Sequence, residues 1–294
     1  MSTRPAGRLR RAWEKNAPPL LALLTGRLPR FVTAPDAAAA PPPTPPVFCY
    51  HHVDAQSFEH DLQFLADNGY RTLTADELCD RLEAATAAPA GARAVALTFD
   101  DGSATLYHAA TPLLARFGMT GVAFVAPRFH VDVVPADLPG PIPCTRPQLL
   151  EMHASGVWDI QGHTLSHRFL PRYPEPMPLI DSSPQWCDRF RGDAPGISAE
   201  LAESKALLEE WLDKPIRHLA FPSYQGTSHA LEVGRKLGYR GFYWGVRPPR
   251  SAHPTTHIQR LDARLLRRLP GRGRLPLRRI LTTGAPHRRR GRAG

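Results

Sequence analysis

Short apolar segments alternate with amphipathic segments over residues 47–262 of this 294-residue chain. The apolar segments have the length and β-prone composition of buried strands. The segments between them repeat apolar residues every three or four positions, as helices with one buried face do. The predicted strands are residues 47–50, 70–73, 94–99, 121–126, 157–161, 216–221, 239–246 and 257–262. Strict alternation of strands and helices predicts parallel strands joined by crossover helices.

Capping residues mark several helix ends. Thr74 and Glu77 form a T-x-x-E capping box, Thr145 precedes a helix with proline in its first turn, and Gly118 and Gly238 each end a helix. About seven or eight strand–helix units are enough to close a barrel. We therefore expect a single α/β domain.

Proline-rich stretches set the limits of this domain. Residues 34–46, APDAAAAPPPTPP, form a linker that cannot join a core, and a second Pro/Gly-rich stretch closes the domain near residue 265. The expected parts are a basic segment with a Pro/Ala-rich linker at 1–46, the domain at 47–265 and a flexible Arg-rich tail at 266–294. Residues 127–144 and 171–197 are expected to be loops on one rim, or insertions without function.

The net charge of +10 resides at the two ends of the chain. Residues 1–35 carry seven Arg or Lys and one Glu, and residues 264–294 carry eleven Arg and no acidic residue, which leaves −7 for the middle. No aromatic residues interleave the tail arginines, which argues against nucleic-acid binding by base stacking. The basic ends reflect either genomic base composition or a weak contact with an anionic membrane surface.

Cysteine spacing and hydropathy bear on the compartment. The four cysteines have no C-x-x-C spacing, which disfavours a disulfide framework or a zinc knuckle. No segment reaches the roughly 18 apolar residues of a membrane span. The stretch APPLLALLTG at 17–26 is the candidate targeting signal, but it is short and contains Pro18 and Pro19. We expect a cytoplasmic protein that can associate with a membrane, with secretion as the alternative.

Polar residues follow four of the predicted strands. Because the carboxyl ends of parallel strands share one rim, these residues are expected to lie together. They are His51 and His52 after the first strand, Asp100 and Asp101 after 94–99, His163 and His167 after 157–161, and Pro222, Ser223 and Tyr224 after 216–221.

The pattern at this rim indicates a metal site. His163 and His167 are spaced i,i+4, so on a helical turn both imidazoles would reach one cation. The adjacent carboxylates of Asp100 and Asp101 repel each other unless a positive charge lies beside them. A divalent cation held by Asp101 and both histidines would leave Asp100 free to take a proton from an attacking water. The alternative is a turn in which Asp101 caps a helix at 103–117.

At these residues the chain resembles a known family. TFDDG at 98–102 and HTLSH at 163–167 are similar to the first two motifs of the NodB-homology polysaccharide deacetylases, carbohydrate esterase family 4. FCYHHV, ATPLLARFGMTGVAFV and LLEMHASGVWDIQGHT resemble it further, and the opening looks most like the poly-N-acetylglucosamine deacetylase branch. The resemblance covers 47–126, 145–168 and, more loosely, 199–262.

The resemblance implies a distorted (β/α)7-type barrel that removes N-acetyl groups from an amino-sugar, so a carbohydrate substrate. It implies Asp100 as general base. It also implies Asp101, His163 and His167 as ligands of zinc or a similar divalent metal.

Departures from the family pattern concern the remaining site residues. The family's third motif has an aromatic residue after proline, whose backbone N–H helps to hold the oxyanion, but here Ser223 follows Pro222 and Tyr224 comes next. Many members have an arginine at the position of Ala220, and Arg260 is the residue that would take its role here. The family also has a late catalytic histidine that acts as an acid, and His257 is the best match to it by position.

His51 either lines the pocket or is a packed histidine. Two alternatives to amino-sugar deacetylation stay open. One is the same chemistry on a lipid-linked sugar or a non-sugar amide, and the other is a catalytically silent glycan-binding barrel.

Overall fold

The computed structural model describes residues 21–35, 41–84, 93–136, 138, 141–170, 196–251 and 253–282. Its strands are β1 (Val47–Tyr50), β2 (Arg71–Thr72), β3 (Ala94–Asp100), β4 (Gly121–Val125), β5 (Trp158–Gly162), β6 (His218–Ala220), β7 (Gly241–Tyr243) and β8 (Leu261–Asp262). Its α-helices are α2 (Arg30–Thr33), α3 (Ala55–Asp67), α4 (Ala75–Glu83), α5 (Thr111–Phe117), α6 (Arg146–Ala154), α8 (Ile197–Leu212), α9 (Ser228–Lys236) and α10 (Leu277–Thr282). The predicted capping box at Thr74 forms, and the helix after Thr145 also begins with a capping box.

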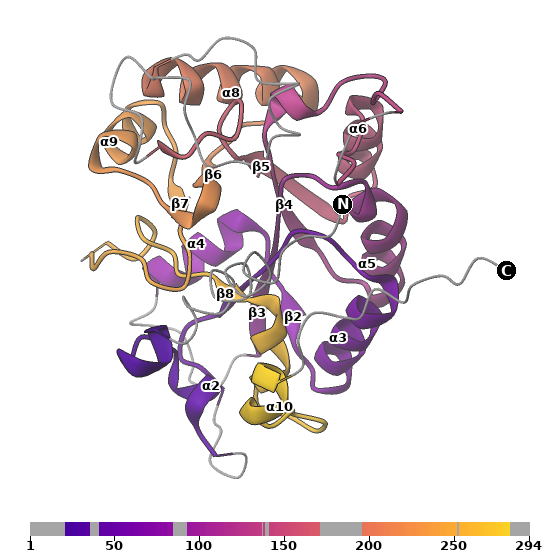
Figure 1. Ribbon diagram of the computed structural model, residues 1–294, viewed down its shortest axis with the longest axis vertical. Coiled ribbons are helices and arrows are strands. Elements are labelled where there is room, and N and C mark those ends of the chain that lie inside the picture. Colours follow the sequence, from indigo (N-terminus) through magenta and orange to yellow (C-terminus); the bar gives the residue numbers. More distant parts are fainter. Residues whose placement is uncertain are drawn as a thin grey trace, which may run out of the picture.

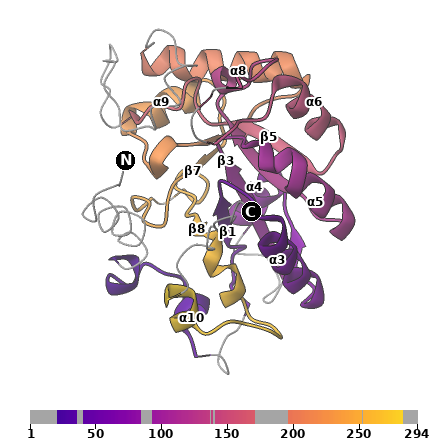
Figure 2. The same cartoon turned by 45° about the vertical axis from the view of Figure 1, so that its right-hand side comes forward.

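All paired strands run parallel, in the order β7-β6-β5-β4-β3-β1-β8, and β2 pairs with the start of β3. A further parallel bridge joins Tyr243 at the end of β7 to Ile258, just before β8. The sheet therefore curls into a half-barrel, with helices α3, α5, α6, α8 and α9 around its outside (Figures 1 and 2). This confirms the distorted (β/α) barrel of parallel strands that the sequence predicts.

Alternate residues of each strand face opposite sides of the sheet. Phe48, Leu97 and Phe99 belong to the apolar core shared with the outer helices. Ala94 and Ala96 belong instead to a second core inside the curl, and the same alternation directs Thr98 and Asp100 inward behind them. A carboxylate thus ends up at the mouth of the barrel interior because of its register on β3.

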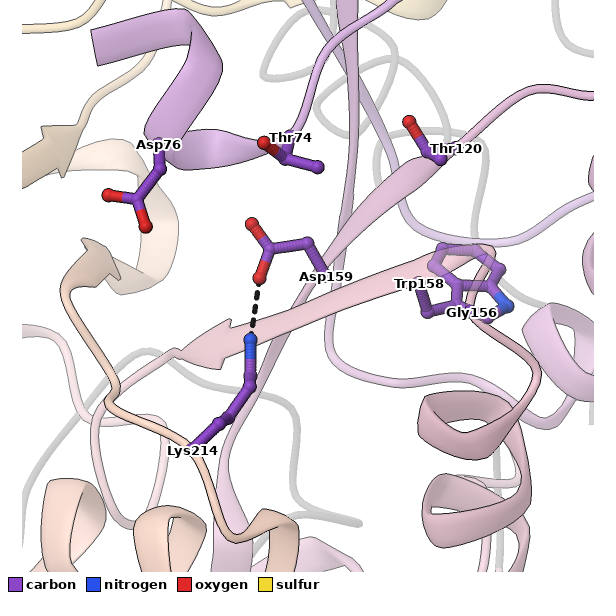
Figure 3. Close-up of a pocket in the computed structure, with 7 residues that line it drawn as sticks. All are labelled: Thr74, Asp76, Thr120, Gly156, Trp158, Asp159 and Lys214. Carbon is purple, nitrogen blue, oxygen red and sulfur yellow. Dashed lines mark hydrogen bonds and ion pairs between the residues drawn. The ribbon is translucent and has the colours of Figure 1, made fainter. Parts of the chain in front are cut away.

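Helix α4 closes the end of the barrel interior at which the strands begin, opposite the end that carries Asp100. Its Leu78 and Cys79 pack in the inner core, and its first turn is fixed by polar contacts. Asp159 of β5 accepts a hydrogen bond from Ala75 N at 2.9 Å. Figure 3 shows the other contact of this carboxylate, its pairing with Lys214 at 2.6 Å.

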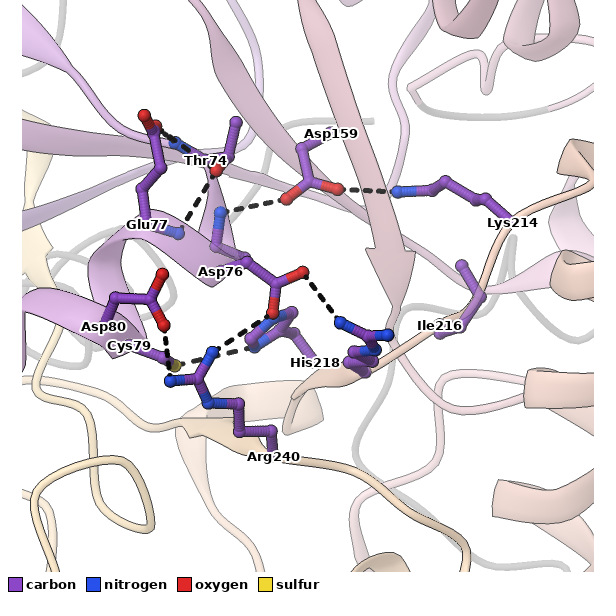
Figure 4. Close-up of polar contacts among 12 residues, drawn as sticks. Thr74, Asp76, Glu77, Cys79, Asp80, Asp159, Lys214, Ile216, His218 and Arg240 are labelled. Carbon is purple, nitrogen blue, oxygen red and sulfur yellow. Dashed lines mark hydrogen bonds and ion pairs between the residues drawn. The ribbon is translucent and has the colours of Figure 1, made fainter. Parts of the chain in front are cut away.

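The same helix is tied to the starts of β6 and β7. Asp76 lies 3.0 Å from His218 Nε2, and Arg240 pairs with Asp76 and Asp80 (Figure 4). Since these charged groups are paired with one another, the cluster acts as an anchor for α4.

The two ends of the described chain pack together. Arg268 donates hydrogen bonds to Val32 O and Ala34 O at 2.8 and 2.7 Å, and Leu266, Leu269 and Ile280 are buried. Packed structure therefore extends to residue 282, beyond the limit of 265 expected from sequence, because several tail arginines bind backbone carbonyl groups of the N-terminal segment. Across the described residues, no helix has the length and apolar character needed to cross a membrane.

Candidate active site

Asp100 and Asp101 are separated by a sharp turn at the end of β3. Asp101 and Gly102 both have left-handed backbones, with φ of 68° and 59°. A Cβ on Gly102 would lie 2.4 Å from the buried ring of His130, so glycine is needed there for space as well as for conformation. The turn keeps Asp100 in the barrel interior and points Asp101 toward the loop after β5.

Asp101, His163 and His167 converge as the sequence predicts. Asp101 Oδ1 lies 3.5 Å from His163 Nε2 and 3.1 Å from His167 Nε2, and the three candidate ligand atoms lie within 4.8 Å of one another. His163 Nδ1 is 2.8 Å from Ala220 O, so this nitrogen carries the proton and Nε2 presents its lone pair to Asp101.

This donor set fits a divalent cation. The buried Asp101 Oδ1 has no hydrogen-bond partner, because the ring nitrogen of His163 that it faces carries a lone pair and not a proton. Burial alone would raise the pKa of Asp101, but the neighbouring His167 outweighs it and holds that pKa well below its ordinary value. Two imidazoles and one ionised carboxylate with an open side are typical of catalytic zinc sites.

The local structure behind this convergence differs from the prediction. His163 and His167 do not lie on a helical turn but in a loop, in which Thr164 and His167 have φ of 62° and 55°. Glu200 of α8 holds the loop by accepting hydrogen bonds from Ser166 N and Oγ at 2.7 and 2.8 Å. The helical-turn expectation was wrong because this distant carboxylate, and not i,i+4 spacing, sets the loop.

The alternative role of Asp101 as a helix cap is not observed. The helical segment after it begins at Ala104, and Ser103 Oγ accepts a hydrogen bond from Thr105 N at 3.3 Å. Asp101 instead directs its carboxylate at the two imidazoles.

Asp100 is paired with Arg260, the residue suggested as a replacement for the missing family arginine. Arg260 Nη1 donates to Asp100 Oδ1 at 2.5 Å, and its Nε donates to Trp244 O at 3.0 Å. Burial raises the pKa of Asp100, but the charge of Arg260 outweighs it and lowers the pKa. Asp100 is therefore ionised near neutral pH, with Oδ2 4.0 Å from His163 Nε2.

Pro222, Ser223 and Tyr224 form a tight turn after β6. Ser223 and Tyr224 have φ of 53° and 66°, and the N–H of Tyr224 is bonded to Phe221 O at 3.0 Å. The Tyr224 hydroxyl lies 3.3 Å from His51 Nε2, and the guanidinium of Arg260 lies over the Tyr224 ring. The turn is thus brought to the same rim as Asp100.

His51 and His257 lie in different surroundings. A ring nitrogen of His51 falls within 4.8 Å of a carboxylate oxygen of Asp100 and of Cys49 Sγ. His257 stacks on Trp244 with ring centroids 5.0 Å apart, belongs to neither candidate ligand cluster of the described residues, and has a pKa lowered by burial and by Arg235. The structure therefore brings His51, and not His257, to Asp100.

Two residues of this region were not singled out from sequence as site residues. The lack of C-x-x-C spacing gave Cys49 no role, although the i,i+2 spacing of Cys49 and His51 on one strand end could have placed both on the side that Asp100 faces. Glu200 carries no local signal because its partner Ser166 is 34 residues away along the chain.

A parallel half-barrel with an Asp-His-His cluster beside a buried Asp–Arg pair defines the class of protein: a distorted (β/α) barrel with its candidate active site at the carboxyl ends of the strands. The family model "Polysaccharide deacetylase" matches residues 87–242, more than half of the chain, and the chain belongs to this family. This confirms the family predicted from TFDDG and HTLSH, a family of hydrolases that act on carbon–nitrogen bonds.

Individual relatives agree with this assignment. The chain is 25% identical to YxkH of Bacillus subtilis (strain 168) over 208 residues, which span 66% of this chain and 62% of that relative. It is similar to IcaB from Ammonifex degensii, with a TM-score of 0.54 and 25% identity over 68% of this chain and 82% of the other. A de-N-acetylase from Aggregatibacter actinomycetemcomitans has the same fold, with a TM-score of 0.56 and 20% identity over 74% of this chain and 95% of the other.

Proposed function

We propose that this protein hydrolyses the N-acetyl amide of an amino-sugar in a carbohydrate substrate, with a divalent cation held by Asp101, His163 and His167. The observation that carries the proposal is the buried Asp101 oxygen facing two imidazole nitrogens, beside an ionised Asp100 that is not part of this Asp-His-His cluster. Zinc suits a set of two nitrogen ligands and one oxygen ligand. When bound, the cation would polarise the acetyl carbonyl and lower the pKa of water.

Asp100 is the group that takes a proton from the attacking water. It lies next to the cluster, with Oδ2 4.0 Å from His163 Nε2, so water beside the cation is within its reach. Arg260 donates a hydrogen bond to the other oxygen of Asp100, Oδ1, and so fixes the orientation of the carboxylate. The pair keeps Asp100 ionised despite burial, which a proton acceptor requires.

His51 is the proposed proton donor to the leaving amine, in place of His257. The His51 ring lies beside Asp100 and the Tyr224 hydroxyl, and both of these groups favour one orientation of the ring. Because the N–H of Tyr224 is bonded to Phe221 O, the Ser223 N–H is the backbone group of this turn that we assign to the developing oxyanion.

Acetate release from N-acetylglucosamine oligomers tests the proposal. Asp100→Asn should lower kcat by about 10²- to 10⁴-fold, the usual contribution of a general base. Asp67→Asn, an exposed carboxylate on α3, is the matched control and should keep full activity. His51→Ala should lower kcat more than His257→Ala does.

Two outcomes contradict the proposal. One is wild-type turnover in Asp100→Asn, and the other is the lack of any acetate release from the zinc-loaded wild type. A loss confined to His257→Ala would move the proton donor back to that residue.

A further inference from the structure

We propose that Cys49, His51 and Asp100 form a second cation site, and that a soft divalent cation bound there inhibits the enzyme. Their candidate ligand atoms all lie within 4.8 Å of one another, in a cluster that shares no residue with Asp101, His163 and His167. The two clusters are neighbours, because Asp100 Oδ2 lies 4.0 Å from His163 Nε2.

Strand pairing builds this second cluster. β1 and β3 are adjacent and parallel, with Cys49 opposite Thr98 and Tyr50 opposite Phe99. Asp100 follows Thr98 by two positions and His51 follows Cys49 by two, so all face the barrel interior. Cys49 Sγ lies 3.5 Å from Asp100 Oδ2, which is about the separation of two ligand atoms on one tetrahedral cation.

The ligand types favour zinc, cobalt or cadmium over calcium or magnesium, because a thiolate and an imidazole are softer donors than carboxylates. Without a cation, Cys49 is a protonated thiol, because its Sγ donates a hydrogen bond to Asp100 Oδ2. Binding therefore breaks the S–H bond, forms a sulfur–metal bond and releases one proton to water. His51 is half-buried, whereas Cys49 and Asp100 are buried, so the cation enters from the side of His51.

Charge makes the second site the weaker of the two. Arg260 already neutralises Asp100 through Oδ1, and a cation at the first site adds further repulsion. Asp100 Oδ2 is not held by Arg260 and remains directed at Cys49. We expect the second cation to bind only after the first.

The inhibition rests on the proposed function, whereas the binding does not. A cation on Asp100 and His51 would occupy both the proton acceptor and the proton donor of the proposed reaction. Cys49 itself takes no part in that reaction. Replacing it should therefore remove the inhibition and spare the activity.

Another buried thiol offers a matched control. Cys79 Sγ lies 3.7 Å from His218 Nδ1, but Asp76 binds the opposite ring nitrogen at 3.0 Å. The three groups therefore lie in a row across the imidazole and do not converge on one point. Cys79→Ser should leave cation binding unchanged.

Titration of the metal-free full-length protein with Co²⁺ tests the binding. The first equivalent should produce no thiolate-to-cobalt charge-transfer band, and the second should produce one. The band should disappear in Cys49→Ser and persist in Cys79→Ser. Absence of the band from the wild type at saturating Co²⁺ would overturn the proposal without depending on how any variant folds. Persistence of the band in Cys49→Ser would overturn it as well.

Acetate release in excess Zn²⁺ tests the consequence. The wild type should be active with one Zn²⁺ and inhibited at least tenfold with two, whereas Cys49→Ser should stay active at both ratios. Activation by the second cation, or equal inhibition of Cys49→Ser, would overturn the inhibitory role. If the protein shows the cobalt band but no turnover at any ratio of Zn²⁺ to protein, the proposed function is refuted and the second cation site stands.

Discussion

Asp100 and Asp101 are neighbours in the sequence, but their carboxylates have different partners. Asp100 faces the buried Arg260 and Asp101 faces His163 and His167. The separation depends on the left-handed backbone of Asp101 and Gly102, which turns the chain between the two side chains. Arg260 holds Asp100 ionised and Asp101 faces two imidazoles, so the two acidic groups can lie side by side at the site.

A carboxylate on α3 behaves in the opposite way and gives a prediction about pH. Burial raises the pKa of Asp61 to about 7, although Tyr50 donates a hydrogen bond to it at 3.0 Å. The folded state therefore holds this proton more tightly than the unfolded state does. The stabilisation is complete below the ordinary pKa near 4 and is lost as pH rises through 7.

The loss should be at most about 4 kcal/mol in the free energy of unfolding between pH 4 and 8. Urea unfolding across this range should show a shallower pH dependence for Asp61→Asn than for the wild type. Asp67→Asn, on the exposed face of the same helix, should keep the wild-type slope. An unchanged slope in Asp61→Asn would show that the carboxyl is not protonated in the folded protein.

At the scale of elements, the hydrophobic pattern of the sequence predicts strands β1 to β8 and most of the helices between them, because period and capping are local signals. The loop after β5 could not be predicted in this way. Its conformation depends on Thr164 and His167 in left-handed backbone and on Glu200, which is distant in sequence. The pairing of Asp100 with Arg260, 160 residues apart, is likewise a tertiary contact, which the family resemblance suggested but periodicity does not show.

The role of Glu200 in this loop can be tested. Glu200→Ala would leave the buried donors of Ser166 without an acceptor, at a cost of about 1–3 kcal/mol, and would release the loop that carries His167. We expect zinc affinity to fall about 10- to 100-fold, as when a group that orients a ligand is lost. Glu200→Gln keeps an acceptor oxygen and should retain most of the affinity.

Calorimetric titration with Zn²⁺ measures this effect. Glu210→Ala, on the exposed face of α8, is the control and should bind as the wild type does. Wild-type affinity in Glu200→Ala would mean that the loop is held by other contacts.

At the scale of the whole molecule, the barrel has one end closed by α4 and the other end open to the site. The two ends of the described part of the chain meet beside β8, where residues 263–274 pack on α2. Arg268 is buried and donates to Val32 O, Ala34 O and Leu275 O. Composition alone predicted a flexible tail here, because it cannot show which arginines find buried carbonyl partners.

Arg268→Ala should therefore destabilise the fold. Three carbonyl groups would lose a charged donor, which we expect to cost about 2–4 kcal/mol in the free energy of unfolding. Arg272→Ala, whose side chain is exposed, should cost less than about 0.5 kcal/mol. Equal stability of the two variants in urea unfolding would show that Arg268 contributes no more than a surface arginine.

The central claim is that one cation bridges the end of β3 and the loop after β5. Elemental analysis of the purified chain, after incubation with Zn²⁺ and removal of free metal, tests it most directly. The wild type and Asp100→Asn should each retain one zinc per chain, and His163→Ala should retain none. Zinc absent from the wild type, or retained equally by His163→Ala, would contradict the account.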